Sequence, residues 1–197
     1  PAMVGLAVTA LPLITFLFQR GAFTVQSSLG TAIALQAYAA GLPFLYGAGI
    51  LARVFYSRSD TRTPALVGVG SLAVGLLAAL ILMRPFQHMG LALASSISSL
   101  VNFFWLYSLF LGREKAFPRW AMLKEVGGYF IMAGLIGLAV WPLAGWAGEA
   151  PSLHLAAIRT LLAVGTGAAL YFLLALLTKN PHLSPLLRLL KKRLKRS

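Results

Sequence analysis

The chain of 197 residues is 59% hydrophobic and 11% charged, and its mean hydropathy is +0.82. These values exclude the usual balance of a soluble domain, which is roughly half apolar and a quarter charged. No cysteine occurs, so disulfides, thiolate metal sites and cysteine nucleophiles are excluded. The chain starts at Pro1 inside an apolar run and shows no recognisable signal peptide, so we expect a piece of a longer polypeptide.

Six apolar stretches follow one another along the chain, and each is close to the roughly 20 residues that a membrane-crossing helix needs. They cover residues 2–18, 29–52, 65–83, 90–111, 126–146 and 155–178. None has a charge near its centre, and backbone groups without hydrogen bonds are costly in lipid, so each stretch predicts a helix. The pattern therefore predicts an all-α integral membrane protein with six transmembrane helices.

The connections between these stretches differ in positive charge. Of 17 Lys and Arg residues, fourteen lie in the second connection, the fourth connection and the tail, and three lie in the first, third and fifth connections. Lys and Arg are retained in cytoplasmic loops, so both ends of this chain are predicted to be cytoplasmic. The net charge of +13 is therefore explained mostly by topology.

The basic tail, residues 179–197, contains the sequence SPLLRLLKKRLKRS. Ser184 is suited to an N-cap and Pro185 to a first helical position, and leucines on one face oppose cations on the other. This pattern predicts an amphipathic helix on an anionic lipid surface. No nucleic-acid partner is expected, because the basic stretch lacks interleaved aromatic residues.

Two spans contain unusual residues. Pro43 in the second span cannot donate a backbone hydrogen bond and predicts a kink, which would be either a packing adjustment or a hinge or cavity wall in a transporter. The fourth span has a polar stripe of Ser95, Ser98, Ser99 and Asn102. Such a stripe forms either interhelical hydrogen bonds or the wall of a wet cavity, and both alternatives remain open.

Residues for covalent chemistry are sparse. The four acidic residues lie in loops or at span edges, and the three histidines lie in three different connections. No carboxylate pair, metal-ligand cluster or phosphate-binding glycine loop can be drawn from them. The sequence therefore predicts neither an enzyme nor a metal or cofactor site.

Two connections are richer in specific residues than topology requires. In the outer loop FQRGAFT, Gly21 permits a tight turn, Arg20 lies at the interface, and Phe23 is predicted to dip back into it. The bland alternative for this loop is an ordered turn with an interfacial anchor.

The second such connection is RVFYSRSDTRTP, residues 53–64. Asp60 between Arg58 and Arg62 predicts a local ion pair, and Thr63 before Pro64 predicts an N-cap for the third span. The segment is either an ordered loop or an arginine-lined contact for a phosphate-bearing substrate, because the arginine fork matches phosphate oxygens.

Four sequence segments in order, RGAF, AYAAGLP, FYSRSDTRTP and GLALASSISSLVNF, resemble the carboxy-terminal half of the lipid II flippase family, MurJ or MviN. The loop positions that match its motifs are Arg20, Gly21, Phe23, Phe55, Tyr56, Arg58, Asp60, Thr61, Arg62, Thr63 and Pro64. With Pro43, Arg53 and Asn102 they form the set of candidate substrate or cavity residues.

The resemblance implies a multi-pass protein of the bacterial inner membrane. The family has fourteen helices in two lobes, belongs to the multidrug, oligosaccharidyl-lipid and polysaccharide exporter superfamily, and moves lipid II to the periplasmic leaflet by alternating access. The six spans would be helices nine to fourteen. Residues 1–111 would belong to the second lobe, 112–125 would be a basic cytoplasmic loop, 126–178 would be two additional helices, and 179–197 would be the tail.

The two additional helices would shape a hydrophobic groove for the lipid tail. The local candidates for its lining are Tyr129, Phe130, Trp141, Tyr171 and Phe172. Three other functions remain open: another exporter of the superfamily for polysaccharide lipids or drugs, a stand-alone membrane scaffold, and an integral-membrane enzyme of lipid metabolism.

Overall fold

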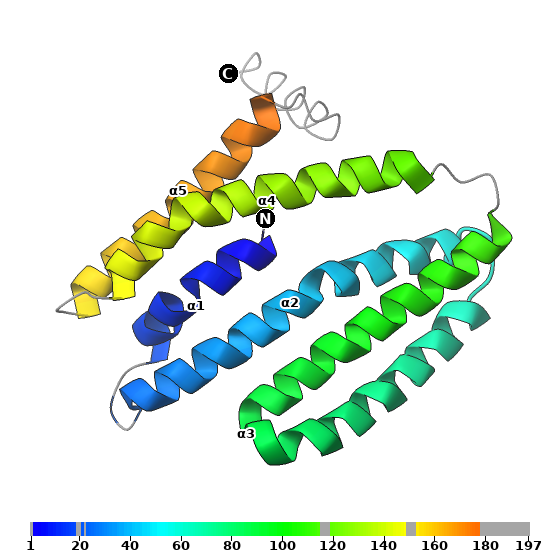
Figure 1. Cartoon of the computed structure of the whole chain (residues 1–197), viewed down its shortest axis with the longest axis horizontal. Helices are drawn as coiled ribbons and strands as arrows, with labels where there is room; N and C mark the ends of the chain where they lie inside the picture. Colours follow the sequence, from blue (N-terminus) through cyan, green and yellow to red (C-terminus); the bar gives the residue numbers. More distant parts are fainter. Residues whose placement is uncertain (1, 19–20, 22, 115–118, 149–152, 178–197) are drawn as a thin grey trace, which may run out of the picture.

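The computed structural model describes residues 2–18, 21, 23–114, 119–148 and 153–177 (Figure 1). The elements in this part of the chain are helices: α1 (Ala2–Phe18), α2 (Val25–Tyr56), α3 (Arg62–Arg113), α4 (Arg119–Gly148) and α5 (Leu153–Leu177). The expected all-α class is therefore confirmed. The predicted amphipathic helix of the tail lies outside the described residues.

Apolar length varies among the helices. By length and composition, α2 and α3 can each cross a membrane. Three shorter apolar segments accompany them: Ala2–Phe18, Phe130–Gly145 and Ile158–Leu173.

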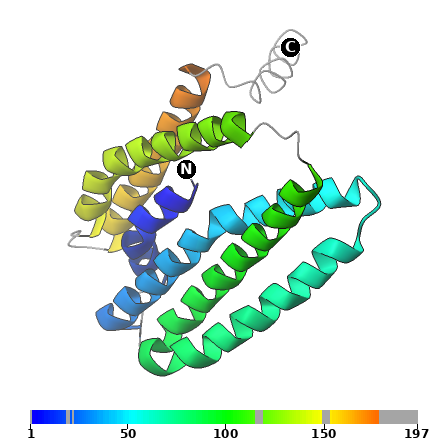
Figure 2. The same cartoon turned by 45° about the vertical axis from the view of Figure 1, so that its right-hand side comes forward.

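Helix α3 consists of two arms. The backbone at Gln87 has φ 47° and ψ −122°, which is not helical, and the chain folds back there so that both arms lie side by side (Figures 1 and 2). Residues 62–86 are called the first arm and residues 88–113 the second arm. The turn is very short because Gly90 lies against the Leu82 carbonyl, where a β-carbon would collide with backbone atoms.

The helices extend beyond the predicted apolar stretches. Helix α2 begins at Val25, where the Thr24 hydroxyl accepts a hydrogen bond from the Ser27 N–H at 3.2 Å, and continues to Tyr56. Helix α4 begins at Arg119, inside the region that was predicted to be a basic loop. An apolar window identifies the part suited to hydrocarbon, whereas backbone hydrogen bonding continues the helix into its polar flanks.

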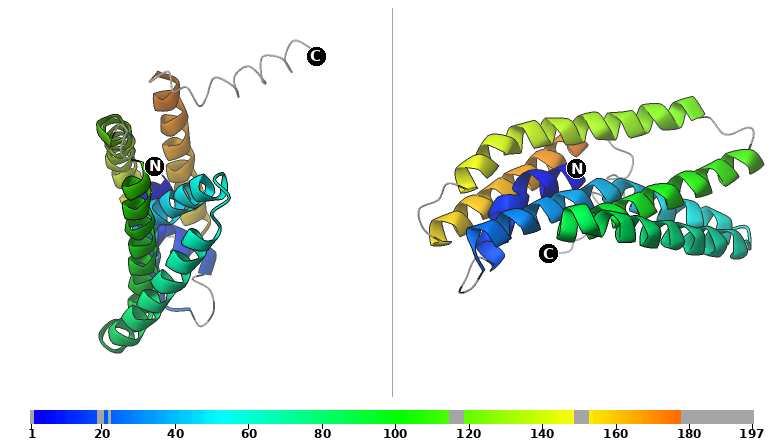
Figure 3. Two further views of the ribbon diagram at one scale, coloured as in Figure 1. Left: turned by 90° about the vertical axis from the view of Figure 1, so that its right-hand side faces the viewer. Right: turned by 60° about the horizontal axis from the view of Figure 1, so that its bottom comes forward.

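Two groups of helices meet at α1 (Figure 3). Helix α2 packs against α3, and α4 packs against α5, while α1 contacts α2, α4 and α5. The core between α2 and α3 consists of Ala48, Phe55, Val67, Leu106 and Phe110, and the core between α4 and α5 consists of Met132, Ile136, Val140 and Ala163. Within the described residues, α1 therefore connects the α2–α3 unit to the α4–α5 unit.

Candidate functional site

The connection between α2 and α3 is a tight turn of few residues. Arg53, Phe55 and Tyr56, which were predicted to lie in this loop, belong to the last turn of α2. The N–H groups of Arg58 and Asp60 both donate to the Phe55 carbonyl, at 3.0 and 3.1 Å. Phe55 is 2% exposed and belongs to the α2–α3 core, so it anchors the turn rather than facing a ligand.

Asp60 lies just before the start of α3. Its carboxylate accepts a hydrogen bond from the Thr63 N–H at 3.0 Å and another from the Thr63 hydroxyl at 2.7 Å. The prediction that Thr63 is the N-cap is therefore wrong: Thr61 occupies the N-cap position, and Thr63 lies in the first turn and donates to the preceding Asp60 carboxylate. Pro64 follows it and is buried, while Thr61 and Arg62 are exposed.

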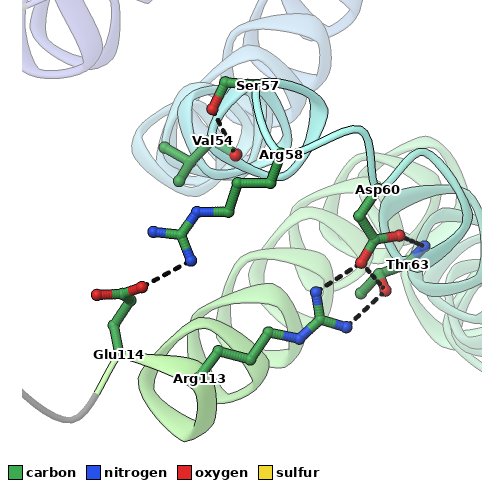
Figure 4. Close-up of polar contacts among 7 residues, drawn as sticks. All are labelled: Val54, Ser57, Arg58, Asp60, Thr63, Arg113 and Glu114. Atoms are coloured by element: carbon green, nitrogen blue, oxygen red, sulfur yellow. Dashed lines mark hydrogen bonds and ion pairs between the residues drawn. The ribbon is translucent and has the colours of Figure 1, made fainter.

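Arg113 at the end of the second arm closes the cluster (Figure 4). Its Nη1 donates to Asp60 Oδ2 at 2.5 Å, and its Nη2 donates to Thr63 Oγ1 at 3.1 Å. The same guanidinium lies over the Phe55 ring, 5.1 Å from the centroid. One side chain thus joins the last turn of α2 to both ends of α3.

A second ion pair runs parallel to the first. Arg58 Nη1 lies 2.7 Å from Glu114 Oε1, beyond the end of the second arm (Figure 4). The predicted local pairing of Asp60 with Arg58 or Arg62 is therefore wrong, because the antiparallel arms bring Arg113 and Glu114 closer than the sequence neighbours. We call Arg58, Asp60, Thr63, Arg113 and Glu114 the arginine clamp.

The electrostatics of the clamp follow from these contacts. The Thr63 N–H, the Arg113 guanidinium and the Thr63 hydroxyl all stabilise the carboxylate and hold the pKa of Asp60 well below its usual range. Both ion pairs are partly exposed, so salt screens them and their individual contribution to stability is small. The directional contacts of the clamp instead fix how the end of α2 and the two ends of α3 are arranged.

Sequence reasoning missed Arg113 and Glu114, which it treated only as charges of the fourth connection. The predicted topology nevertheless contained information that could have pointed to these two residues. Two spans joined by a short outer loop return the chain to the same side of the membrane, so the second and fourth connections must lie at the same level. Opposite charges in those connections were therefore candidates for pairing.

The outer loop agrees with its predicted turn where the structure describes it. Gly21 has φ +58°, the left-handed conformation that favours glycine. Phe23 packs against the Phe18 ring at 6.1 Å between centroids and against the core of Ala10, Ile14 and Ala32. Arg20 lies outside the described residues.

Pro43 lies in an unbroken part of α2 that packs closely on the second arm. Gly41 faces Ser96, whose hydroxyl donates to the Ala37 carbonyl at 2.6 Å. Gly47 faces the Phe103 ring. These contacts fit the packing interpretation, Pro43 also lines the cavity of about 230 Å³ beside α1 and α4, and the hinge stays a prediction.

The polar side chains along the second arm differ in their hydrogen bonds. The Ser98 hydroxyl donates across to the Ser71 carbonyl of the first arm at 2.8 Å, whereas Ser99 donates to Ser95 in its own arm. Asn102 is different: within the described chain its buried Oδ1 accepts no hydrogen bond. Ser98 therefore connects the arms, and the role of Asn102 stays a prediction.

An apolar cavity of about 580 Å³ opens between α1, α4 and α5. Its lining residues are small or aliphatic apart from Thr9 and Tyr171; they are Ala2, Gly5, Leu6, Thr9, Leu13, Ile136, Val140, Ala163, Val164, Gly167, Ala168 and Tyr171. Of the predicted groove residues, Tyr171 lines this cavity and Phe130 lines a smaller one of about 230 Å³ beside α2. Trp141 and Phe172 are exposed, and the side chain of Tyr129 is outside the described set.

The described residues contain no cluster of three His, Asp or Glu side chains that could hold a metal ion. The arrangement instead combines long apolar helices, a charged clamp at one end and an apolar cavity. Together with the apolar composition, these features are consistent with the class of helical membrane proteins.

Comparison with known proteins identifies the group within this class. The family profile described as "Lipid II flippase MurJ" matches residues 1–149. The chain is 37% identical over 145 residues to the probable lipid II flippase MurJ of Haemophilus influenzae, which covers 72% of this chain and 28% of that protein. It is 30% identical over 180 residues to the corresponding Vibrio cholerae protein, which covers 89% of this chain and 34% of that protein.

A third relative, the lipid II flippase MurJ of Thermosipho africanus, is 33% identical over 138 residues, which is 70% of this chain and 28% of the relative. The chain belongs to the lipid II flippase MurJ family. It spans about a third or less of the length of these relatives.

Proposed function

We propose that the protein containing this chain translocates lipid II, the undecaprenyl-pyrophosphate-linked peptidoglycan precursor, from the cytoplasmic to the periplasmic leaflet of the bacterial inner membrane. The observation that carries the proposal is the family match over residues 1–149. The activity is transport by alternating access and involves no covalent chemistry on the substrate.

The topology belongs to the same proposal. Helices α1 and α2, the two arms of α3, and helices α4 and α5 would form six membrane crossings, equivalent to the last six of a fourteen-helix, two-lobed transporter. Both ends of the chain would be cytoplasmic, with the arginine clamp on that side and the basic tail on anionic lipid. The distribution of Lys and Arg among the connections supports this orientation.

The apolar cavity supports the choice of a lipid substrate. Its lining of glycine, alanine and aliphatic side chains suits a hydrocarbon chain, which gains little from directional contacts. We propose that α4 and α5 hold the polyprenyl tail there, while the pyrophosphate and sugars travel through a polar path elsewhere.

The experiment is genetic rescue. Cells depleted of their own lipid II flippase should grow when the complete gene product containing this chain is expressed, and lipid II should become accessible to an external probe. Normal expression without rescue and without exposed lipid II would contradict the proposal.

A further inference from the structure

One exposed face of helix α2 carries three tyrosines and an arginine beside the exposed Leu45. Tyr38, Tyr46 and Tyr56 are 44%, 67% and 51% exposed, and Arg53 on the same face is also exposed. Their spacings of eight, seven and three residues place them on one side of a helix with 3.6 residues per turn. We call these four residues the α2 stripe.

The first arm of α3 provides the contrast. Between residues 65 and 83, every exposed side chain is apolar, and the largest exposed fractions belong to Leu66, Leu72 and Ile81. Such a face is suited to lipid tails. A tyrosine hydroxyl inside hydrocarbon needs a hydrogen-bond partner, so the α2 stripe is unsuited to the same surroundings.

Interfacial anchoring leaves one tyrosine of the α2 stripe unexplained. Tyr56 ends α2 and has the ordinary position of a tyrosine at the membrane surface. Tyr46 and Tyr38 lie about 15 and 27 Å farther along the helix axis, at about 1.5 Å per residue. Because the hydrocarbon layer is about 30 Å thick, Tyr38 is close to its opposite surface, and the Tyr46 hydroxyl is the one that lies deep in the predicted span.

Arg53 adds a charge that the clamp does not use. Arg58 and Arg113 are both engaged in ion pairs, whereas no ion pair in the described chain involves Arg53. A guanidinium presents a planar fork that matches phosphate oxygens, and tyrosine hydroxyls can bond the hydroxyls and amides of sugars. The Arg53 guanidinium and the tyrosine hydroxyls are therefore complementary to a phosphate-linked sugar, while the Tyr46 side chain also lines the smaller apolar cavity together with Phe130.

We propose that the α2 stripe forms a wall of the polar path and contacts the pyrophosphate and sugar headgroup of the lipid substrate as it crosses. The inference rests on the proposed lipid II transport and assigns the part of this chain that meets the headgroup. Arg53 meets the phosphates near the cytoplasmic end, and Tyr46 and Tyr38 meet the sugars farther along.

Water access is tested with depth-matched cysteines. The chain has no cysteine of its own; any others in the complete gene product are replaced first. Tyr46→Cys lies ten residues before the end of α2, and Leu72→Cys lies ten residues after the start of α3, so both are about 15 Å from the same turn. Gly49→Cys and Val69→Cys form a second pair, seven residues from it.

A charged, membrane-impermeant thiol reagent should label Tyr46→Cys and Gly49→Cys at least about tenfold faster than their partners on α3, because thiolates form poorly in hydrocarbon. The α-carbon of Gly49 has open space around it, so a cysteine fits without strain. Equal, slow labelling at both depths would overturn the inference, even if the complete protein rescues flippase-depleted cells.

Ligand contact is tested with the same variants. Lipid II should slow the labelling of Tyr46→Cys, while undecaprenol, which has the same tail without phosphate or sugar, should not. Equal protection by both lipids would assign the tail to this face and contradict the inference. Failure of rescue by the unmodified protein would instead contradict the proposed function.

The charge is tested by Arg53→Gln with Arg84→Gln as its control. Arg84 is an exposed arginine at the opposite end of the first arm. Loss of a charge-assisted hydrogen bond should lower lipid II translocation about tenfold for Arg53→Gln at equal abundance, with Arg53→Lys intermediate. Translocation by Arg53→Gln equal to that by Arg84→Gln would count against a phosphate contact.

Discussion

The α2–α3 unit and the α4–α5 unit each have an apolar core, but they differ in what accompanies it. In the former the arginine clamp and a serine-to-carbonyl hydrogen bond join the helix ends and the arms, whereas the latter borders a cavity of about 580 Å³. Directional contacts specify one geometry, while apolar packing in a bilayer tolerates several because lipid tails compete for it equally well. We therefore predict a more rigid frame in α2–α3 and a more adaptable region in α4–α5.

The largest loss of stability is expected in the α2–α3 unit, at the glycine that permits the sharp turn between the two arms of α3. Gly90→Ala places a β-carbon against the Leu82 carbonyl and should destabilise the protein by about 3 kcal/mol through overpacking. Gly68→Ala is the control, because its β-carbon meets open space. Thermal unfolding in detergent should show a clearly lower midpoint for Gly90→Ala and an almost unchanged midpoint for Gly68→Ala. Equal midpoints for the two variants would disprove the tight hairpin.

A substitution in the cavity beside α4 and α5 should affect transport more than it affects the stability of the fold. Ala168→Trp fills part of the apolar cavity and should lower lipid II translocation about tenfold, while the amount of folded protein stays near normal. Ala169→Trp is the control, since Ala169 is exposed but does not line the cavity. Similar translocation by both variants would show that the cavity does not hold the substrate tail.

The clamp should give a smaller, pH-dependent effect. Asp60→Asn removes the charge that receives Arg113, so its unfolding midpoint should fall by a few degrees at neutral pH. The folded-state pKa of Asp60 lies below its ordinary value of 3.8, so the stabilisation is present above that pH and is lost as the pH falls toward the folded-state pKa.

The measurement is the difference in unfolding midpoint between the native chain and Asp60→Asn across a pH series. The difference should be constant near neutrality and shrink below about pH 4. A double-mutant cycle with Arg113→Gln should show coupling. Additive effects of the two substitutions would mean that the ion pair does not form.

The smallest effects are expected at two neighbouring polar residues of the second arm. Ser98→Ala removes the hydrogen bond to the Ser71 carbonyl and should destabilise by about 0.6 kcal/mol. Asn102→Leu removes a buried oxygen without a hydrogen bond in the described chain and should be neutral or slightly stabilising. Unfolding in detergent measures both, and lost abundance of Asn102→Leu would reveal a structural partner for Asn102.

Several features of the fold could be predicted from local sequence. The apolar stretches located helices, and Gly21 located a left-handed turn, because each depends on only a few neighbouring residues. The prediction failed where distant residues compete with near ones: Asp60 was assigned to Arg58 or Arg62, but it pairs with Arg113, 53 residues away. The role of residues 53–64 as a substrate site therefore stays a prediction, whereas the ion pair predicted inside that segment was wrong.

Amino-acid composition and the order of apolar segments determined by themselves that this chain is helical and membrane-embedded, because bilayer thickness and backbone hydrogen bonding act on every segment separately. Tertiary structure alone decided that Arg113 pairs with Asp60, that Gly90 permits a nearly loop-free hairpin, and that the exposed tyrosines of α2 share one face. These features depend on which helix faces which, and side-chain packing between segments distant in sequence sets that arrangement.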